Sequence, residues 1–542
     1  MQTYDYIVVG AGSAGCVIAG RLSEDPNCQV LLIEAGRDDR TTLVRKPGMI
    51  AVIHTVPQVK KKFDWGYYSK PRDWTVNRAI PQARGKVLGG SSAINGMVYV
   101  RGNRKNYDDW AAEGCDGWSF DEVLPYFKRL ENFEGGGNEY RGAGGPIECT
   151  YSPNIRPVTQ AFMEAVSGAC GVPITDDYNG ADQEGVGVLQ MNAKDGLRYS
   201  TAEGYINPHL NKRPNLHVKL LGHVHRVVIE SGRATGVVVA DKKGRTETIG
   251  ASKEVILSGG VIGSAQILML SGIGPAEHLR EHGIECIADL PVGKNLHDHL
   301  FFPLVYTAPS AINRGTPGYF AKGVMEEYVL GRRSWLSKSV FEALAFLKTD
   351  PSQPIPDLQV HTLPWSYPAP NQDAPVRPEV DPRPCITVQP TLIYPESRGE
   401  LLLQSADPTV APIYDPHYLE LDADRQTLMR GIEMTREFMA HPAVAREITE
   451  EIEPGVNFRD KQALLRELPN RVCTVYHPVG TCRMGTDERA VVDPQLRVRG
   501  IEGLRVADAA IMPTITGGNT NVPSIMIGEK AADLIRGITS AR

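Results

Sequence analysis

The sequence predicts an α/β fold with two domains, one of which begins with a strand–turn–helix–strand unit. Its 542 residues exceed what a single hydrophobic core normally organises. Near the N-terminus, residues 4–9 and 29–34 have the apolar pattern of strands, and between them lie the glycine turn 10–15 and a helical segment at 14–22. Residues 306–464 are rich in proline, and we interpret them as the second domain.

The N-terminal unit is typical of a Rossmann-type dinucleotide site. Gly10 permits the tight turn, Gly12 lets a pyrophosphate approach the backbone, and Gly15 lets the helix pack on the strand. Glu34 ends the second strand, where a carboxylate accepts hydrogen bonds from an adenosine ribose. Because FAD and NAD both carry ADP, the unit alone leaves the cofactor open. The residues expected along this part of the nucleotide are Gly10, Gly12, Ser13, Ala14, Gly15, Glu34 and Ala35.

Composition and charge favour a small-molecule partner. Apolar residues make up 42% and charged residues 23% of the chain, which excludes disordered and fibrous classes. The net charge of −6 gives no basic field for nucleic acid or for an anionic membrane. No segment reaches the roughly 18 consecutive apolar residues of a membrane-spanning helix. We therefore expect no nucleic acid partner and no transmembrane segment.

The cysteines and the N-terminus favour the cytoplasm. Nine cysteines are spread singly without a C-x-x-C pair, so neither a zinc site nor a disulfide framework is expected. The first residues lack the basic, apolar and cleavage regions of a signal peptide, and we expect that nothing is removed before folding. A monomer or a small homo-oligomer is expected.

Several later segments are expected to return to the first domain. The apolar alternation at 216–221, 224–229, 236–240, 246–249 and 254–257 predicts five strands, which we interpret as an added sheet layer. A final helix is expected over 525–535. The N-terminal and C-terminal parts of the chain are thus expected to build one domain together.

The sequence resembles the glucose–methanol–choline (GMC) oxidoreductases. A second glycine-rich stretch at 85–102 resembles the first signature of that family, and residues 259–275 resemble the second. The remaining matches follow in the family's order along the whole chain, at residues 291–299, 395–399, 477–485 and 506–528.

This resemblance implies an FAD-binding domain of Rossmann type assembled from discontinuous segments, and an α+β substrate domain on an antiparallel sheet. It also implies that Val224 contacts the adenine through its backbone, and that Asp508 and Ala509 lie near the ribityl chain and flavin ring. The expected FAD-binding parts are 1–155, 216–305 and 465–542, with a mixed region at 156–215 and the substrate domain at 306–464. The residues expected along the flavin are Gly89, Gly90, Ser91, Asn95, Gly96, Met97 and Val98.

The resemblance also bears on how the flavin is held. Some family members attach it covalently through a histidine in the second glycine-rich stretch, at the position of Ile94 here. Isoleucine cannot form that bond, so non-covalent FAD is expected.

The expected reaction is oxidation of a primary alcohol to an aldehyde, with hydride transfer to flavin N5 and reoxidation by O₂ or a quinone-like acceptor. A base must take the O–H proton near neutral pH, and His477 matches the family's catalytic histidine. Asn519 aligns with the second polar group, which stabilises negative charge on the substrate oxygen. Asn521 is its rival. Either asparagine could instead cap a helix beginning near Pro523, and capping is favoured for Asn521.

Three other features bear on the site. His297-Asp298-His299 suggests a metal, but without a third ligand structural hydrogen bonding is favoured. Val475 would present an apolar surface to the ring, which favours oxygen as the acceptor. Aromatic residues of the second domain mostly serve its core, and one or two are expected to line the substrate pocket, where they could stack on a cation. They are Phe301, Phe302, Tyr306, Tyr319, Phe320, Trp335, Trp365 and Tyr367.

Other functions are compatible with parts of the sequence. The same fold could act as a flavin-containing lyase or photodecarboxylase, although no residue argues for either. An NAD-dependent dehydrogenase would leave all motifs after the N-terminal turn unexplained, and a non-catalytic flavin carrier would not need His477 and Asn519.

Overall fold

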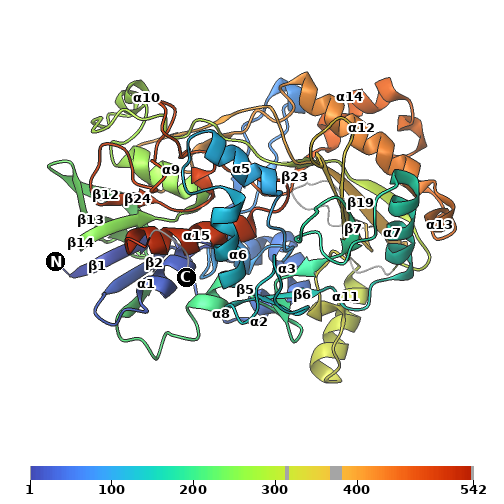
Figure 1. The fold of residues 1–542 in the computed structure, drawn as a ribbon, viewed down its shortest axis with the longest axis horizontal. Coiled ribbons are helices and arrows are strands. Elements are labelled where there is room, and N and C mark those ends of the chain that lie inside the picture. Colours follow the sequence, from blue (N-terminus) through green and yellow to red (C-terminus); the bar gives the residue numbers. More distant parts are fainter. Residues whose placement is uncertain (1, 312–315, 367–380, 539–542) are drawn as a thin grey trace.

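Two large sheets organise the computed structural model, which describes residues 2–311, 316–366 and 381–538 (Figure 1). A seven-stranded sheet lies near both ends of the chain, and an eight-stranded sheet lies at the opposite end of the molecule. In the described residues no helix is long and apolar enough to cross a membrane.

The seven-stranded sheet is parallel at its centre. Its order is β11-β2-β1-β14-β13-β12, with β24 paired to β14. The pairs β1:β2, β2:β11, β1:β14 and β14:β24 are parallel, whereas β12, β13 and β14 pair antiparallel. The strands are β1 (Thr3–Val9), β2 (Val30–Glu34), β11 (Leu216–Leu220), β12 (His223–Glu230), β13 (Arg233–Ala240), β14 (Thr246–Leu257) and β24 (Leu504–Val506).

The expectation of an added sheet layer is wrong, because these strands extend the same sheet. Segments 246–249 and 254–257 are one continuous strand, β14. Its first half pairs with β13 and its second half with β1, and a register shift between Tyr4 and Tyr6 accommodates the change of partner. Ser252 and Lys253 are exposed in the middle of this strand. Because both are polar, they interrupt the apolar pattern of the sequence, which therefore indicates two strands in place of one.

The last helix packs against the first. Helix α1 (Gly15–Leu22) follows the glycine turn, and α15 (Asn521–Ile535) lies beside it (Figure 1). A Cβ on Gly528 would lie 2.8 Å from the carbonyl oxygen of Ala14, so the two backbones approach closely here. Helix α15 begins four residues earlier than expected, with Pro523 in its first turn, where a missing N–H costs nothing.

The eight-stranded sheet is antiparallel, with the order β22-β16-β19-β18-β17-β7 and β15 bridging β19 and β23. Helices α7 (Pro157–Cys170) and α12 (Asp422–Met439) pack on it and on each other. Its strands are β7 (Gly185–Val188), β15 (Leu300–Phe301), β16 (Leu304–Thr307), β17 (Ala343–Leu347), β18 (Leu358–Leu363), β19 (Cys385–Leu392), β22 (Glu451–Glu453) and β23 (Cys473–Thr474).

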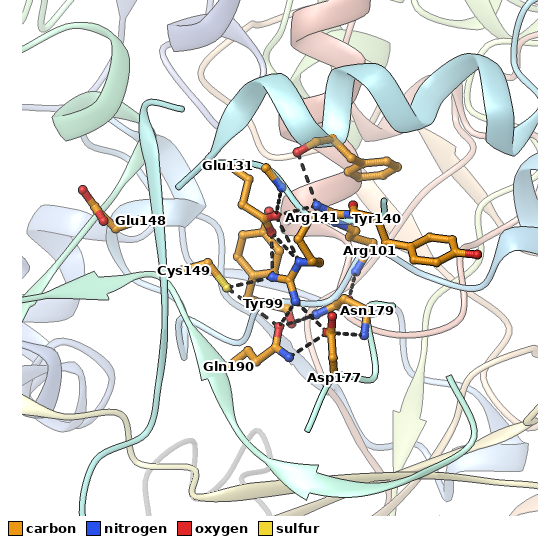
Figure 2. A network of polar contacts seen from close by, with 12 residues as sticks. Tyr99, Arg101, Glu131, Tyr140, Arg141, Glu148, Cys149, Asp177, Asn179 and Gln190 are labelled. Carbon is orange, nitrogen blue, oxygen red and sulfur yellow. Dashed lines mark hydrogen bonds and ion pairs between the residues drawn. The ribbon is translucent and has the colours of Figure 1, made fainter. Parts of the chain in front are cut away.

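A buried charge network holds the end of the second glycine-rich stretch at Arg101 (Figure 2). Glu131 accepts hydrogen bonds from Arg101 and Arg141, each with a 2.7 Å contact, and Arg141 also donates to Asp177 at 2.6 Å. Asn179 accepts the backbone N–H of Arg101 at 2.8 Å. Because each buried charge has an opposite partner, the network fixes the chain beyond Val98 without an uncompensated ion.

Candidate active site

A cavity of about 400 Å³ connects the two sheets. At one end it is lined by the glycine turn after β1, and at the other by residues of β18, β19 and the segment after β23. Segments that are distant in the sequence, such as Gly10–Ala14, Gly90–Val98 and Val475–Pro478, therefore share one continuous site.

The glycine turn has the backbone geometry of a phosphate cradle. Gly10 has a φ of 94°, and a Cβ there would lie 2.4 Å from the carbonyl oxygen of Ser258. A Cβ on Gly15 would lie 1.9 Å from the carbonyl oxygen of Gly10, so Gly15 is needed for close packing. A Cβ on Gly12 would have a single neighbour, at 3.9 Å, and would project into the cavity. Gly15 itself does not line the cavity.

The second glycine-rich stretch forms the next part of the wall. Gly90 lies directly on Gly12, since a Cβ on Gly90 would be 2.6 Å from Gly12 Cα. Gly89 lies behind the wall, where its N–H donates to the Ala11 carbonyl at 2.8 Å. The predicted cofactor residues that do line the cavity are Gly10, Gly12, Ser13, Ala14, Glu34, Ala35, Gly90, Ser91, Asn95, Gly96, Met97, Val98, Val224, Asp508 and Ala509.

Glu34 is held at the end of β2 by backbone donors. Its two carboxylate oxygens accept the N–H groups of Ala11 at 3.0 Å and Gly36 at 2.7 Å. Burial raises the pKa of Glu34 to about 7, and the two hydrogen bonds oppose this shift. Each oxygen keeps a second lone pair, so the side chain can still accept a ribose hydroxyl.

These features fit FAD. Gly12 leaves open the space that a Cβ would fill, as a pyrophosphate requires, and the N-terminus of α1 favours an anion there. From this point the lining continues past Asp508 to His477, a path that suits a flavin nucleotide. Ile94 also lines the cavity and is 2% exposed.

His477 and Asn519 meet at the end of the cavity away from the glycine turn. The Asn519 amide nitrogen lies 3.1 Å from His477 Nε2. Gln359 Nε2 donates to Asn519 Oδ1 at 3.0 Å, which leaves the amide nitrogen of Asn519 to donate to the imidazole. His477 Nε2 is therefore the acceptor, and Nδ1 carries the proton. This Nδ1 lies 3.2 Å from Nδ1 of His299, which accepts from it.

Asn521 lies elsewhere. It accepts a hydrogen bond from the hydroxyl of Ser13 at 2.8 Å, at the glycine turn, and its amide lies 3.4 Å from Asn192 Oδ1. Capping is wrong for both asparagines, because the N-cap of α15 is Thr520 and makes no side-chain cap hydrogen bond. Only Asn519 of the two is in contact with His477.

Asp298 holds the backbone at His299 and His477 by hydrogen bonds, on the side away from the cavity. From the sequence, only a structural role in hydrogen bonding was expected for it. Its Oδ1 accepts the backbone N–H groups of His299 at 2.9 Å and His477 at 2.8 Å. The described residues contain no cluster of three or more metal-ligating side chains. The donors to Asp298 Oδ2 are Gln82 Nε2 at 2.8 Å and the hydroxyls of Tyr414 at 3.2 Å, Tyr418 at 2.5 Å and Thr474 at 2.6 Å.

Family comparison agrees with this arrangement. Two models of the GMC oxidoreductases match, an N-terminal one over residues 4–301 and a C-terminal one over residues 395–528. The chain belongs to the GMC oxidoreductase family. The sequence is 41% identical over 538 residues to the oxygen-dependent choline dehydrogenase of Rhizobium etli, covering 98% of this chain and 95% of that protein. It is 40% identical to the Sinorhizobium medicae protein of the same name, with the same coverage.

Solved structures share the fold. Pyridoxine 4-oxidase from Mesorbium loti is 29% identical, with a TM-score of 0.86 and coverage of 98% of both chains. Formate oxidase is 26% identical, with a TM-score of 0.88 and coverage of 99% of this chain and 98% of that chain. This protein is thus an enzyme of the GMC oxidoreductases, which act on CH–OH donors, and FAD is the cofactor expected of it. The predicted α/β and α+β fold class is confirmed.

The three imidazoles at this end of the cavity, those of His477, His299 and His361, are neutral at pH 7. Burial lowers the pKa of His477 well below its usual value, and the neighbouring His299, His361 and Arg84 lower it further. Burial also lowers the pKa of His299 to about 3 and that of His361 to about 4. A neutral His477 is unprotonated at Nε2, so the lone pair that accepts the Asn519 N–H can instead take a proton from a bound molecule.

Some of the other side chains near His477 and Asn519 were expected from the sequence. Of the aromatic candidates, Phe301 and Trp365 line the cavity, whereas Tyr367 lies outside the described residues. Val475 lines it as well. Arg84, Gln359 and His361 were missed, because no local sequence pattern connects them to His477.

Proposed function

We propose that this enzyme oxidises a primary alcohol to an aldehyde, with His477 as the base and Asn519 as the hydrogen-bond donor to the substrate oxygen. The observation that carries the proposal is the contact between the neutral His477 Nε2 and the Asn519 amide inside the cavity. One acceptor and one donor at a single point are what an alcohol hydroxyl needs as it loses its proton.

The side chains act as follows. A substrate hydroxyl between the two residues donates its O–H to His477 Nε2 and accepts an N–H from Asn519. As the O–H bond breaks, His477 takes the proton at Nε2, while its Nδ1–H remains directed at His299. The hydrogen bond from the Asn519 amide strengthens as negative charge grows on the substrate oxygen, and Gln359 keeps that amide in its orientation. FAD, when bound, supplies the hydride acceptor at N5.

The remaining predicted residues would hold the cofactor. Gly10, Gly12, Ser13 and Ala14 would hold the pyrophosphate, with Gly15 and Glu34 shaping the turn and the ribose site. Reoxidation by O₂ or a quinone-like acceptor completes the cycle, and the names of relatives, an oxygen-dependent dehydrogenase and an oxidase, support oxygen. The residues proposed to follow the nucleotide from its ribose to the flavin ring are Ala35, Val224, Gly90, Ser91, Asn95, Gly96, Met97, Val98, Asp508 and Ala509, with Gly89 supporting the wall from behind.

The proposed reaction is tested by anaerobic mixing. The yellow enzyme is mixed without oxygen with a panel of aliphatic, benzylic and polyol alcohols, and the flavin absorbance near 450 nm is followed. Bleaching by at least one alcohol, with formation of its aldehyde, is expected, and the speed of recolouring in air separates an oxidase from a dehydrogenase. Product formation with the flavin still oxidised would instead indicate a lyase and contradict the proposal.

The FAD is expected to be dissociable. Ile94 lines the cavity where a histidyl attachment would lie, and its side chain offers no nucleophilic atom. Denaturation in guanidinium followed by gel filtration should leave a colourless polypeptide and release all the flavin in the small-molecule fraction. Absorbance at 450 nm that stays with the denatured chain would refute non-covalent binding.

A further inference from the structure

A polar strip crosses the sheet at the substrate end of the cavity. Strands β18 and β19 pair antiparallel there, with His361 opposite Gln389 and Gln359 opposite Thr391. Residues two apart on a strand, and residues directly opposite each other on neighbouring strands, share one face of a sheet. Gln359, His361 and Gln389 therefore lie on one face, and His361 and Gln389 line the cavity. The apolar and aromatic residues that line this end of the cavity are Phe301, Val340, Phe341, Leu363, Trp365 and Tyr476.

Two of the three polar side chains in this strip serve the reacting point. Gln359 Nε2 donates to Asn519 Oδ1 at 3.0 Å and so orients the amide that meets His477. The His361 side chain also interacts with that of Asn519, and burial lowers the pKa of His361 to about 4, so it is neutral at pH 7. Both side chains are thus engaged by Asn519.

Gln389 is the third polar side chain of the strip, and the protein does not use its amide. Gln389 is 3% exposed and lines the cavity. Within the described part of the chain its side chain makes no hydrogen bond, and its amide nitrogen and oxygen both remain accessible from the cavity. A buried amide of this kind is stabilised by a partner that the cavity supplies. A hydroxyl group suits it, because a hydroxyl accepts from the amide N–H and donates to the amide oxygen.

The strand register sets the distance of this amide from the reacting point. The pair His361:Gln389 lies two residues along β18 from the pair Gln359:Thr391, which is about 7 Å at the usual rise of a strand. Gln359 contacts Asn519, and Asn519 meets the reacting hydroxyl. A second hydroxyl of the substrate is therefore expected roughly 5–8 Å from the first. The atoms between the two hydroxyls would lie against the apolar and aromatic lining.

We propose that the substrate carries a second, uncharged hydroxyl group, which the Gln389 amide binds while the primary alcohol lies between His477 and Asn519. This inference rests on the proposed alcohol oxidation and specifies which alcohols fit. Gln389 is then a specificity-determining residue that favours diols and hydroxyaryl methanols. It is not in contact with the reacting hydroxyl, so its loss changes the choice of substrate and leaves the base and the oxygen-binding donor in place.

The test uses pairs of alcohols that have the same shape and differ by a hydroxyl in place of a methyl group. Pentane-1,5-diol is paired with hexan-1-ol, and 4-hydroxybenzyl alcohol with 4-methylbenzyl alcohol. Anaerobic stopped-flow measurement on the holoenzyme gives the second-order rate constant of flavin reduction for each, halved for the diol because both of its ends can react. In at least one pair the hydroxyl member should react about tenfold faster or more, because a site built to bind a hydroxyl rejects an analogue that leaves its polar group unpaired.

Two outcomes of this measurement separate the inference from the function on which it rests. Equal rates within both pairs, or faster reaction of both methyl members, overturn the inference while alcohol oxidation stands. No bleaching by any alcohol, with a flavin that dithionite still reduces, overturns the proposed function itself.

Substitution of Gln389 separates the effect of its amide from the intrinsic reactivity of the alcohols. Gln389→Met keeps the approximate size of the side chain and removes both hydrogen-bonding atoms, so the preference for the hydroxyl member should disappear. Thr391→Val is the matched control, because Thr391 is a buried polar residue of the same strand, does not line the cavity and donates its hydroxyl to the Gln389 carbonyl at 3.1 Å. This control should keep the wild-type preference. An unchanged preference in Gln389→Met would overturn the inference.

Discussion

His477→Ala is expected to lower the rate at which the substrate alcohol reduces the flavin by about 10²-fold or more, while FAD stays bound. The physical reason is the loss of the acceptor at Nε2, because a positioned general base typically contributes about 10²–10⁴-fold to the rate. The surface proposed to bind FAD should be unaffected, since the cradle formed by the glycine turn and the second glycine-rich stretch lies at the other end of the cavity. The loss should therefore appear in the chemical step.

The measurement is the anaerobic rate of bleaching at saturating alcohol, with the flavin content of each preparation determined first. His297→Gln is a matched control, because His297 is also a buried imidazole of the region but does not line the cavity. Glutamine keeps a donor for the Asn295 carbonyl, which now accepts from His297 Nδ1 at 2.7 Å. Near-normal bleaching in His477→Ala, or an equal loss in both variants, would contradict the role of His477.

Asp298→Ala is expected to lower the free energy of unfolding by about 3–5 kcal/mol, the usual cost of removing one partner from a buried charged network. The carboxylate is 2% exposed, and its removal leaves buried donors without an acceptor, among them the backbone N–H of His477. The loop that carries the proposed base loses its anchor at the same time. We therefore expect a fall in both stability and the rate of flavin reduction.

Denaturant unfolding of the holoenzyme, followed by protein and flavin fluorescence, measures this effect. Asp298→Asn serves as the milder comparison, because its side-chain oxygen still accepts the N–H groups of His299 and His477, while its NH₂ faces the donor of Gln82. Asp407→Ala is the surface control, as Asp407 is exposed and bonds only to nearby residues and should cost under about 1 kcal/mol. A loss in Asp298→Ala no larger than in Asp407→Ala would disprove the anchoring role.

Local patterns predicted the nucleotide half of the molecule well. The glycine turn and its flanking strand and helix depend on residues that are neighbours in sequence, and they occur where periodicity and glycine spacing indicate. For β14 the sequence pattern predicts two strands, because the exposed Ser252 and Lys253 interrupt its apolar residues. The structure has one strand, since the backbone pairing continues on both sides of this interruption. Here hydrogen bonding to two different partners, which no single segment reveals, decided the structure.

The reacting end was predictable only in part. His477 was found through its motif, but its partners Asp298 and His299 lie more than 100 residues away in the sequence, and only the folded chain brings them together. The same holds for Gln359, which donates to Asn519. Asn519 and Asn521 are two positions apart and were nearly equivalent in the sequence. The start of α15 at Asn521 separates them, because it directs one side chain to the glycine turn and leaves the other beside the imidazole.

The packing of α15 on α1 couples the two ends of the cavity. Ser13 of the glycine turn and Asn521 of α15 are 508 positions apart in the sequence but share a hydrogen bond, and Asn519 lies two residues before Asn521. If α15 moved away, the surface of α1 around Ala14 that Gly528 contacts would be exposed to water, and Ser13 would lose its acceptor. A substitution that loosens this helix contact is therefore expected to disturb the glycine turn and the position of Asn519 together.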